Sequence, residues 1–110
     1  MDFQNVINAN GPLPVSNEFT AESDAQMVLF VSGSAWTQEA GNWIGIDVQV
    51  DGQSIGMASV YTNEATSHRA LIPILLPVTV SAGSHTITFN PLNGFTIADE
   101  NDYFNATLIF

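Results

Sequence analysis

The chain lacks cysteine and lysine, and its 110 residues include one arginine, Arg69. Without cysteine there is no disulfide, no thiolate metal site and no cysteine nucleophile. Eleven Asp and Glu residues stand against that single arginine, which gives a formal charge of −10. Such a charge repels phosphate groups, so we expect neither nucleic-acid binding nor attachment to anionic membranes.

Long apolar runs are missing as well. The longest, Ala70 to Val78, contains two prolines and is far shorter than the ~20 residues that a membrane span needs. The first residues show neither the basic segment nor the apolar segment of a signal peptide. These features do not assign a cellular compartment, and an extracellular or particle-surface location is favoured.

Apolar residues instead alternate with polar ones, which is typical of strands, and no long segment has helical periodicity. The best alternation runs from Trp43 to Val50 and is followed by Asp51-Gly52, a strong signal for a two-residue hairpin turn. We expect the returning strand to direct Ile55 and Met57 inward. Further strands are expected over 3–9, 18–21, 26–36, 69–80, 85–89 and 103–110.

This spacing predicts an all-β fold, an antiparallel β-sandwich with the jelly-roll arrangement of about eight strands, as one domain over residues 1–110. In the 69–80 run, proline indicates an edge strand or a bulge, because it cannot donate to the ladder. We expect its inner face to carry Ile72, Ile74, Leu76, Val78 and Val80, and the inner face of the last strand to carry Phe104, Ala106, Leu108 and Phe110.

Several strands are apolar on both faces, although the outer face of a sandwich is normally polar. The residues expected on outer faces are Val28, Phe30, Trp36, Leu71, Leu75, Tyr103 and Ile109. Covering loops or a bulge would explain them, but a subunit interface also favours aromatic and apolar side chains. We therefore predict that the chain associates with itself as a homodimer or homotrimer.

Aromatic and amide side chains gather around the loop 37–42. Trp36 and Trp43 flank it, and flat aromatic faces with nearby amides and carboxylates suit sugar rings. The predicted ligand-binding residues are Trp36, Trp43, Glu39, Asn42, Asn63 and Tyr61, with Phe95 and Tyr103 as further members of an aromatic platform. The alternative is that the tryptophans fill the core or an interface.

Acidic and amide side chains also cluster at Asp99, Glu100, Asn101 and Asp102. Calcium takes several oxygen ligands, so these four residues are a candidate Ca²⁺ site, although a solvated loop explains them too. The two histidines show no paired metal-ligand spacing, and His85 is expected to lie partly buried beside Ile87. Catalytic motifs are absent, so we predict that the protein is not an enzyme.

Three segments resemble strand pairs of known jelly-roll domains: 48–56 ("VQVDGQSIG"), 78–89 ("VTVSAGSHTITF") and 102–109 ("DYFNATLI"). The resemblance spans residues 26–110 and points to two groups. One comprises jelly-roll carbohydrate-binding modules and lectins, and implies glycan binding, calcium-assisted in some members. The other comprises trimeric jelly rolls similar to tumour necrosis factor and complement globular heads, and implies assembly through apolar faces.

From these features we predict a non-catalytic, lectin-like carbohydrate-binding protein that acts as a homo-oligomer. The alternative is a structural assembly subunit, such as a fibre tip, coat or decoration protein, without a small-molecule ligand.

Overall fold

The computed structural model describes all 110 residues, which form strands and loops. No helix is present that is long and apolar enough to cross a membrane. The strands are β1 (Phe3–Asn10), β2 (Val15–Ala21), β3 (Ala25–Ala35), β4 (Asn42–Val50), β5 (Gln53–Thr62), β6 (Arg69–Ala70), β7 (Ile74–Val80), β8 (Gly83–Pro91) and β9 (Tyr103–Ile109).

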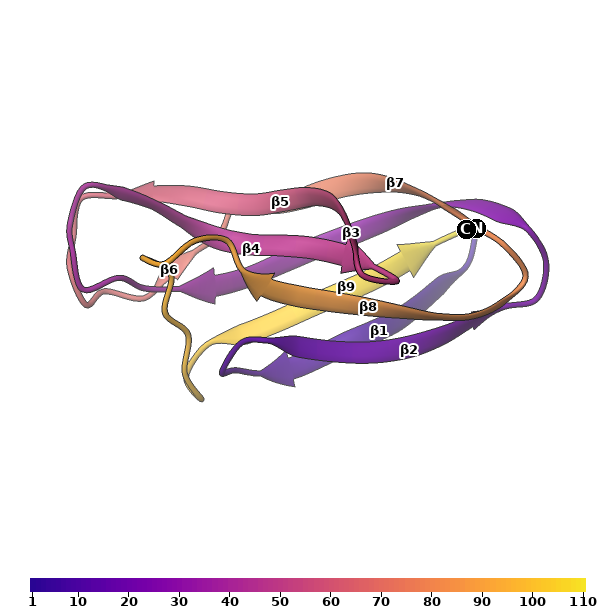
Figure 1. Cartoon of the computed structure of the whole chain (residues 1–110), viewed down its shortest axis with the longest axis horizontal. Coiled ribbons are helices and arrows are strands. Elements are labelled where there is room, and N and C mark those ends of the chain that lie inside the picture. The colour runs from indigo at the N-terminus through magenta and orange to yellow at the C-terminus, as the bar shows by residue number, and fades with distance from the viewer.

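Two antiparallel sheets pack face to face (Figure 1). The four-stranded sheet has the order β2-β8-β4-β5 and faces the viewer in Figure 1. The five-stranded sheet has the order β1-β9-β3, with β7 and the short β6 both pairing with the far side of β3. Apart from the β4–β5 hairpin, each long strand is followed by one in the other sheet. This pairing, with eight long strands, confirms the predicted jelly roll.

The core lies between the two sheets and is formed by alternate residues of their central strands. Phe89 of β8 and Phe104 of β9 meet edge to face across the layers, with ring centroids 6.3 Å apart. Ten further residues around them are fully buried: Leu29, Val31, Ala35, Ile44, Ile46, Val48, Ile87, Ala106, Leu108 and Leu71. Phe110, expected to face inward, is 49% exposed because it lies beyond the last strand.

The β4–β5 hairpin turns at Asp51 and Gly52, whose φ angles are 52° and 83°. Positive φ at both positions is the type I′ pattern that the Asp-Gly pair predicts. A β-bulge follows, because Val48 pairs with Gly56 whereas Gln49 pairs with Ser54. The extra residue, Ile55, reverses the facing of the rest of β5, and the inward expectation for Met57 is wrong: its side chain is 52% exposed.

The 69–80 run is divided rather than continuous, since β6 ends at Ala70 and β7 begins at Ile74. Between them, Leu71 donates its backbone N–H to Gly33 of β3, and Ile72 donates to Ser59 of β5. The segment therefore crosses from one sheet toward the other and changes its facing. Leu71 is buried and Ile72 is 62% exposed, which is the reverse of both expectations.

Beyond this crossing the prediction for β7 holds. Leu76, Val78 and Val80 are buried, and β7 pairs only with β3, so it is the edge strand that its proline indicates. The two termini lie side by side (Figure 1), with Asp2 and Phe110 exchanging backbone hydrogen bonds.

Candidate functional site

An aromatic pair is exposed on the outer face of the four-stranded sheet. Trp43 on β4 and Tyr61 on β5 are register partners, and their rings meet edge to face with centroids 5.6 Å apart. The side chains are 55% and 45% exposed. Exposed aromatic rings in contact offer an apolar surface to a ligand, and we call this pair the aromatic platform.

The β-bulge at Ile55 creates the platform. In an unbroken ladder closed by Asp51-Gly52, Trp43 would face Val60, and Tyr61 would point into the core. The single extra residue advances the register so that Tyr61 lies opposite Trp43. Gly56, next to the bulge, is the sequence signal that was missed, because an isolated glycine within a strand is typical of a bulge.

Polar groups from two loops border the platform. Asn42 begins β4 beside Trp43, and its side chain donates to the backbone oxygen of Glu39 at 2.9 Å. Gly41, with φ of 82°, donates its N–H to the backbone oxygen of Thr62. A side chain at this glycine would come within 3.6 Å of the Tyr61 hydroxyl. Trp43 therefore lies just after the loop that carries Glu39, and Tyr61 lies just before the loop that carries Asn63.

The other predicted aromatic residues lie elsewhere. Trp36 forms a backbone bridge with Ile97, and its ring packs on His68 at 5.9 Å between centroids. Its indole Nε1 is buried and has no acceptor. Tyr103 projects from the five-stranded sheet, where its hydroxyl donates to the side chain of Asn8. The structure thus brings Trp43 and Tyr61 together and separates Trp36 and Tyr103 from them.

Phe95 lies in a hollow near the loop 37–42. It is 44% exposed and lines an open cavity of about 190 Å³ with Thr37, Gln38, Glu39, Gly94 and Ile97. Asn93, two residues earlier, donates its side-chain N–H to the backbone oxygen of Trp43. This contact connects the 92–97 loop to the strand that carries the platform.

Asp102, from the acidic loop, is fully buried and holds several segments together. One carboxylate oxygen accepts from Ser34 Oγ and contacts His68 Nδ1, each at 2.7 Å; the other accepts the backbone N–H of Asp99 at 2.9 Å. The hydrogen bond with Asp102 raises the pKa of His68 above its usual value. His68 Nε2 lies 3.8 Å from Asp99 Oδ2, which adds to this cluster.

The acidic loop therefore does not present its four predicted ligands equally. Glu100 and Asn101 are exposed, whereas the Asp102 oxygens are already bonded to three groups of the chain. The carboxylates of Asp99 and Asp102 lie with His68 in one cluster, within 4.8 Å of one another. Calcium binding at this loop stays a prediction, and a melting temperature raised by calcium and restored by EDTA would establish it.

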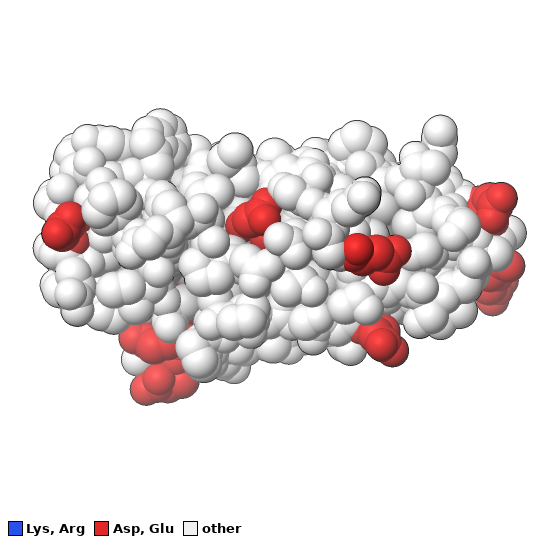
Figure 2. Space-filling view, viewed as in Figure 1, with Lys and Arg blue, Asp and Glu red and all other residues white.

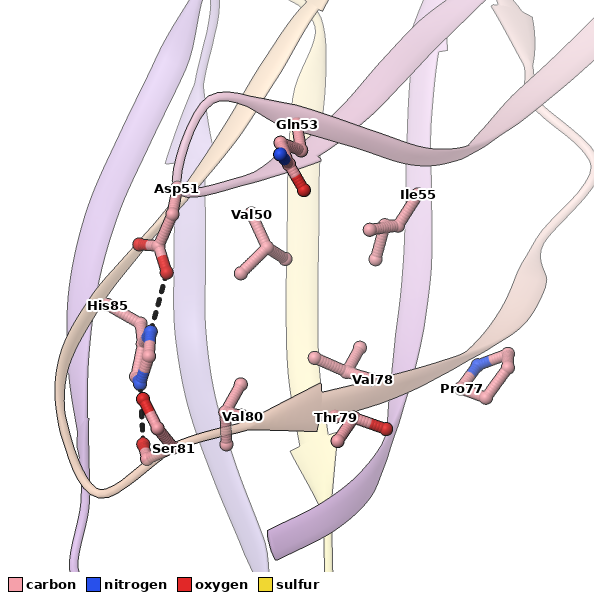
Figure 3. Close-up of a pocket in the computed structure, with 10 residues that line it drawn as sticks. All are labelled: Val50, Asp51, Gln53, Ile55, Pro77, Val78, Thr79, Val80, Ser81 and His85. Atoms are coloured by element: carbon pink, nitrogen blue, oxygen red, sulfur yellow. Dashed lines mark hydrogen bonds and ion pairs between the residues drawn. The ribbon is translucent and has the colours of Figure 1, made fainter. Parts of the chain in front are cut away.

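His85 borders an open cavity of about 280 Å³ between the β4–β5 hairpin and β7 (Figure 3). Its Nδ1 lies 2.6 Å from an Asp51 carboxylate oxygen, and its Nε2 lies 2.6 Å from the backbone oxygen of Ser81. The hydrogen bond with Asp51 and then that with Ser81 raise the pKa of His85. Both ring nitrogens are engaged, so His85 serves the fold rather than a ligand.

Acidic residues are spread over the outer face of the four-stranded sheet and its ends (Figure 2). Asp47 lies within this face on β4, and its carboxylate accepts from Gln49 and Ser54. Glu18 lies on the same face of β2 and is exposed. A ligand at the platform therefore meets a surface of negative charge, which favours neutral or cationic ligands over anionic ones.

Comparisons with known proteins identify the fold. No protein-family model and no curated protein sequence matches the chain. Among solved structures, a family 35 carbohydrate-binding module from an environmental isolate superposes with a TM-score of 0.57. The match covers 98% of this chain and 72% of that module, at 14% sequence identity. The chain thus has the β-sandwich fold of a carbohydrate-binding module, as its strand phrases predict.

Proposed function

We propose that this protein is a non-catalytic carbohydrate-binding module whose binding site is the aromatic platform of Trp43 and Tyr61. The observation that carries the proposal is the exposure of both rings, in contact, on the outer face of a sheet. Burying such rings under a ligand is favourable because it removes apolar area from water. Neither ring belongs to the hydrophobic core, so a ligand can cover both without disturbing the packing between the sheets.

The chemistry of the platform suits a sugar ring. The apolar C–H face of a pyranose stacks on an aromatic face, while its hydroxyls need hydrogen-bond partners at the rim. Asn42 directly precedes Trp43, Asn63 follows Tyr61 by two residues, and Asn42 donates to the backbone oxygen of Glu39. The amide and carboxylate groups of these three residues are the proposed hydrogen-bond partners of the sugar. The surrounding acidic residues make a neutral glycan the preferred ligand class over a sulfated or phosphorylated one.

The similarity to the family 35 carbohydrate-binding module supports this proposal at the level of architecture. Modules of that kind are binding domains without a reaction of their own, in keeping with the absence of catalytic motifs in this chain. A fold by itself does not define a ligand, so the local argument from the platform is the necessary second part.

The test begins with a glycan array and continues with a fluorescence titration of each hit. The Trp36→Phe variant leaves Trp43 as the sole tryptophan, so a ligand on the platform must change its emission. We expect Trp43→Ala to weaken binding at least tenfold, since it removes the principal stacking surface. Met57→Ala is the matched control, because Met57 is equally exposed on the same outer face of the sheet.

Undiminished binding by Trp43→Ala would reject the platform as the site.

A second candidate function, a structural assembly subunit without a small-molecule ligand, is favoured by the exposed apolar residues of the five-stranded sheet. A blank array together with a stable oligomer would support that function instead.

A further inference from the structure

We infer that the outer face of the five-stranded sheet is an interface with a second copy of this chain, so that the protein is a homodimer with the two sheets packed face to face. This inference goes beyond glycan binding, because it concerns the sheet opposite the platform. We call this surface the uncharged face. Its residues are Phe3, Asn5, Asn8 and Asn10 of β1; Tyr103, Asn105, Thr107 and Ile109 of β9; Gln26, Val28, Phe30, Ser32 and Ser34 of β3; and Leu75, Pro77 and Thr79 of β7, with Ala70 of β6.

The distribution of charge favours association through the uncharged face. The chain has eleven acidic residues and a formal charge of −10, yet none of the residues of the uncharged face is Asp, Glu, Lys or Arg. The outer face of the other sheet, in contrast, carries Glu18 and Asp47. Like charges brought into contact across an interface are costly. The uncharged face is therefore a surface through which two such acidic molecules can meet without opposing carboxylates.

Apolar side chains are exposed along two rows that cross the sheet. The register places Phe3, Ile109, Val28 and Pro77 side by side in one row, and Thr107, Phe30 and Leu75 in the next. Phe3 is 67% exposed, Leu75 is 60% exposed and Val28 is 37% exposed. Neighbouring exposed apolar side chains of this kind mark an interaction surface, whereas scattered ones do not.

The uncharged face is also large enough for a dimer interface. Measured over Cα atoms, the molecule extends 45 by 24 Å across the sheets and 21 Å through them. The uncharged face lies on one of the two broad sides, whose projected area is about 1,000 Å². A standard interface buries ~800 Å² on each partner. A second copy can therefore cover enough area by packing on this side alone.

The partner is a second copy rather than an unrelated protein because the face offers no charged groups for recognising a different protein. It has no charge with which to select a basic or an acidic partner. Its apolar rows are bordered by amides and hydroxyls, and these groups can pair with their own kind in a two-fold arrangement. Among them, Asn5 donates to Thr107, and Thr107 donates to Asn105.

The test is sedimentation equilibrium of the full chain at micromolar concentration. We expect a mass of twice 11.8 kDa for the wild type and 11.8 kDa for Val28→Asp and Leu75→Asp, which place a carboxylate on the face. Met57→Asp, which places one on the exposed face of the other sheet, should remain dimeric. A wild-type monomer at these concentrations, or a dimer that survives both substitutions on the face, would overturn the inference.

Cysteine cross-linking keeps the inference testable if the Asp variants fold poorly. The chain has no cysteine, so one introduced thiol is unique. Thr107 lies in the middle of the uncharged face, and Thr88 lies in the middle strands of the opposite sheet, paired with Gln49 and Ser16. We expect Thr107→Cys to form a disulfide-linked dimer under mild oxidation and Thr88→Cys to form at least tenfold less. Equal cross-linking of the two would reject the proposed interface.

Loss of glycan binding by Trp43→Ala and loss of the dimer by Leu75→Asp are separate results, since the two residues lie on opposite sheets. Failure of one proposal therefore leaves the other open to its own experiment.

Discussion

His85 illustrates at the residue scale how two turns are held together by one side chain. Its two ring nitrogens contact a carboxylate oxygen of Asp51 and a carbonyl oxygen of Ser81, both of which are acceptors. Only the protonated imidazole donates from both nitrogens, so the fold favours the charged form. The His85 hydrogen bond and then the Thr86 backbone N–H lower the pKa of Asp51 in turn.

We predict that the melting temperature falls as the pH rises above about 6.5. The folded pKa of His85 exceeds its ordinary value of 6.5, so its stabilisation is complete below that value and is lost as the pH rises through the folded pKa. His68 is shifted in the same direction and adds to the fall. Asp51 acts in the acidic range: because its pKa is lowered in the folded protein, it stabilises the fold above pH 3.8, and this stabilisation is lost as the pH falls further.

Thermal melts of the wild type and His85→Gln from pH 5 to pH 9 measure this effect. The variant should begin less stable at pH 5 and should lose less stability on going to pH 9. A wild-type melting temperature that is constant across this range would contradict the prediction.

Asp102 is the second residue with a large expected effect. Asp102→Asn replaces an acceptor oxygen by an N–H₂ group that faces donors, while the side chain stays fully buried. We predict a loss of about 2–3 kcal/mol in the free energy of unfolding, measured by chemical denaturation. Glu100→Gln in the same loop is exposed and should change it by less than ~0.5 kcal/mol. Equal effects of the two substitutions would argue against the structural role of Asp102.

At the scale of elements, the β4–β5 hairpin shows both what was predictable and what was not. The Asp51-Gly52 pair predicts the turn because both positions need positive φ, and they have it. Strict alternation fails beyond the turn, because the bulge at Ile55 moves Met57 outward. The Leu71–Ile72 exchange arises similarly, where the chain leaves one sheet and contacts the other.

The candidate site depends on the same bulge. Trp43 and Tyr61 were each predicted as ligand-binding residues, but their contact depends on a register that alternation alone does not contain. Trp36 was predicted beside them because it flanks the same loop, and proximity along the chain misleads when a loop connects two different sheets. Pairing registers and sheet membership are long-range properties, which local sequence patterns specify only weakly.

Gly52→Ala is expected to destabilise the hairpin by about 1 kcal/mol, since φ of 83° disfavours a residue with a Cβ atom. A Cβ atom at Gly52 would contact nothing within 4 Å, so the cost comes from the backbone alone. Gly94→Ala is the matched control, because it has equal space and no positive φ. Urea denaturation of both variants measures the difference, and equal stabilities would contradict the argument.

At the scale of the whole molecule, the net charge opposes association while the uncharged face permits it. We predict that the proposed dimer becomes tighter as salt increases, because the Debye length falls from about 30 Å at 0.01 M to about 3 Å at 1 M. Sedimentation at low and high salt should show the dissociation constant decreasing several-fold. A dimer that dissociates in high salt would indicate an interface built on ion pairs, which the uncharged face lacks.

The platform and the uncharged face lie on opposite sides of a sandwich that is two layers thick. Two copies joined at the uncharged face would therefore direct their platforms away from each other. Such a dimer cannot bind one flat surface with both platforms. Its two platforms can instead bind two separate surfaces and connect them. It should therefore agglutinate glycan-coated particles, and a monomeric variant should coat the same particles without clumping them.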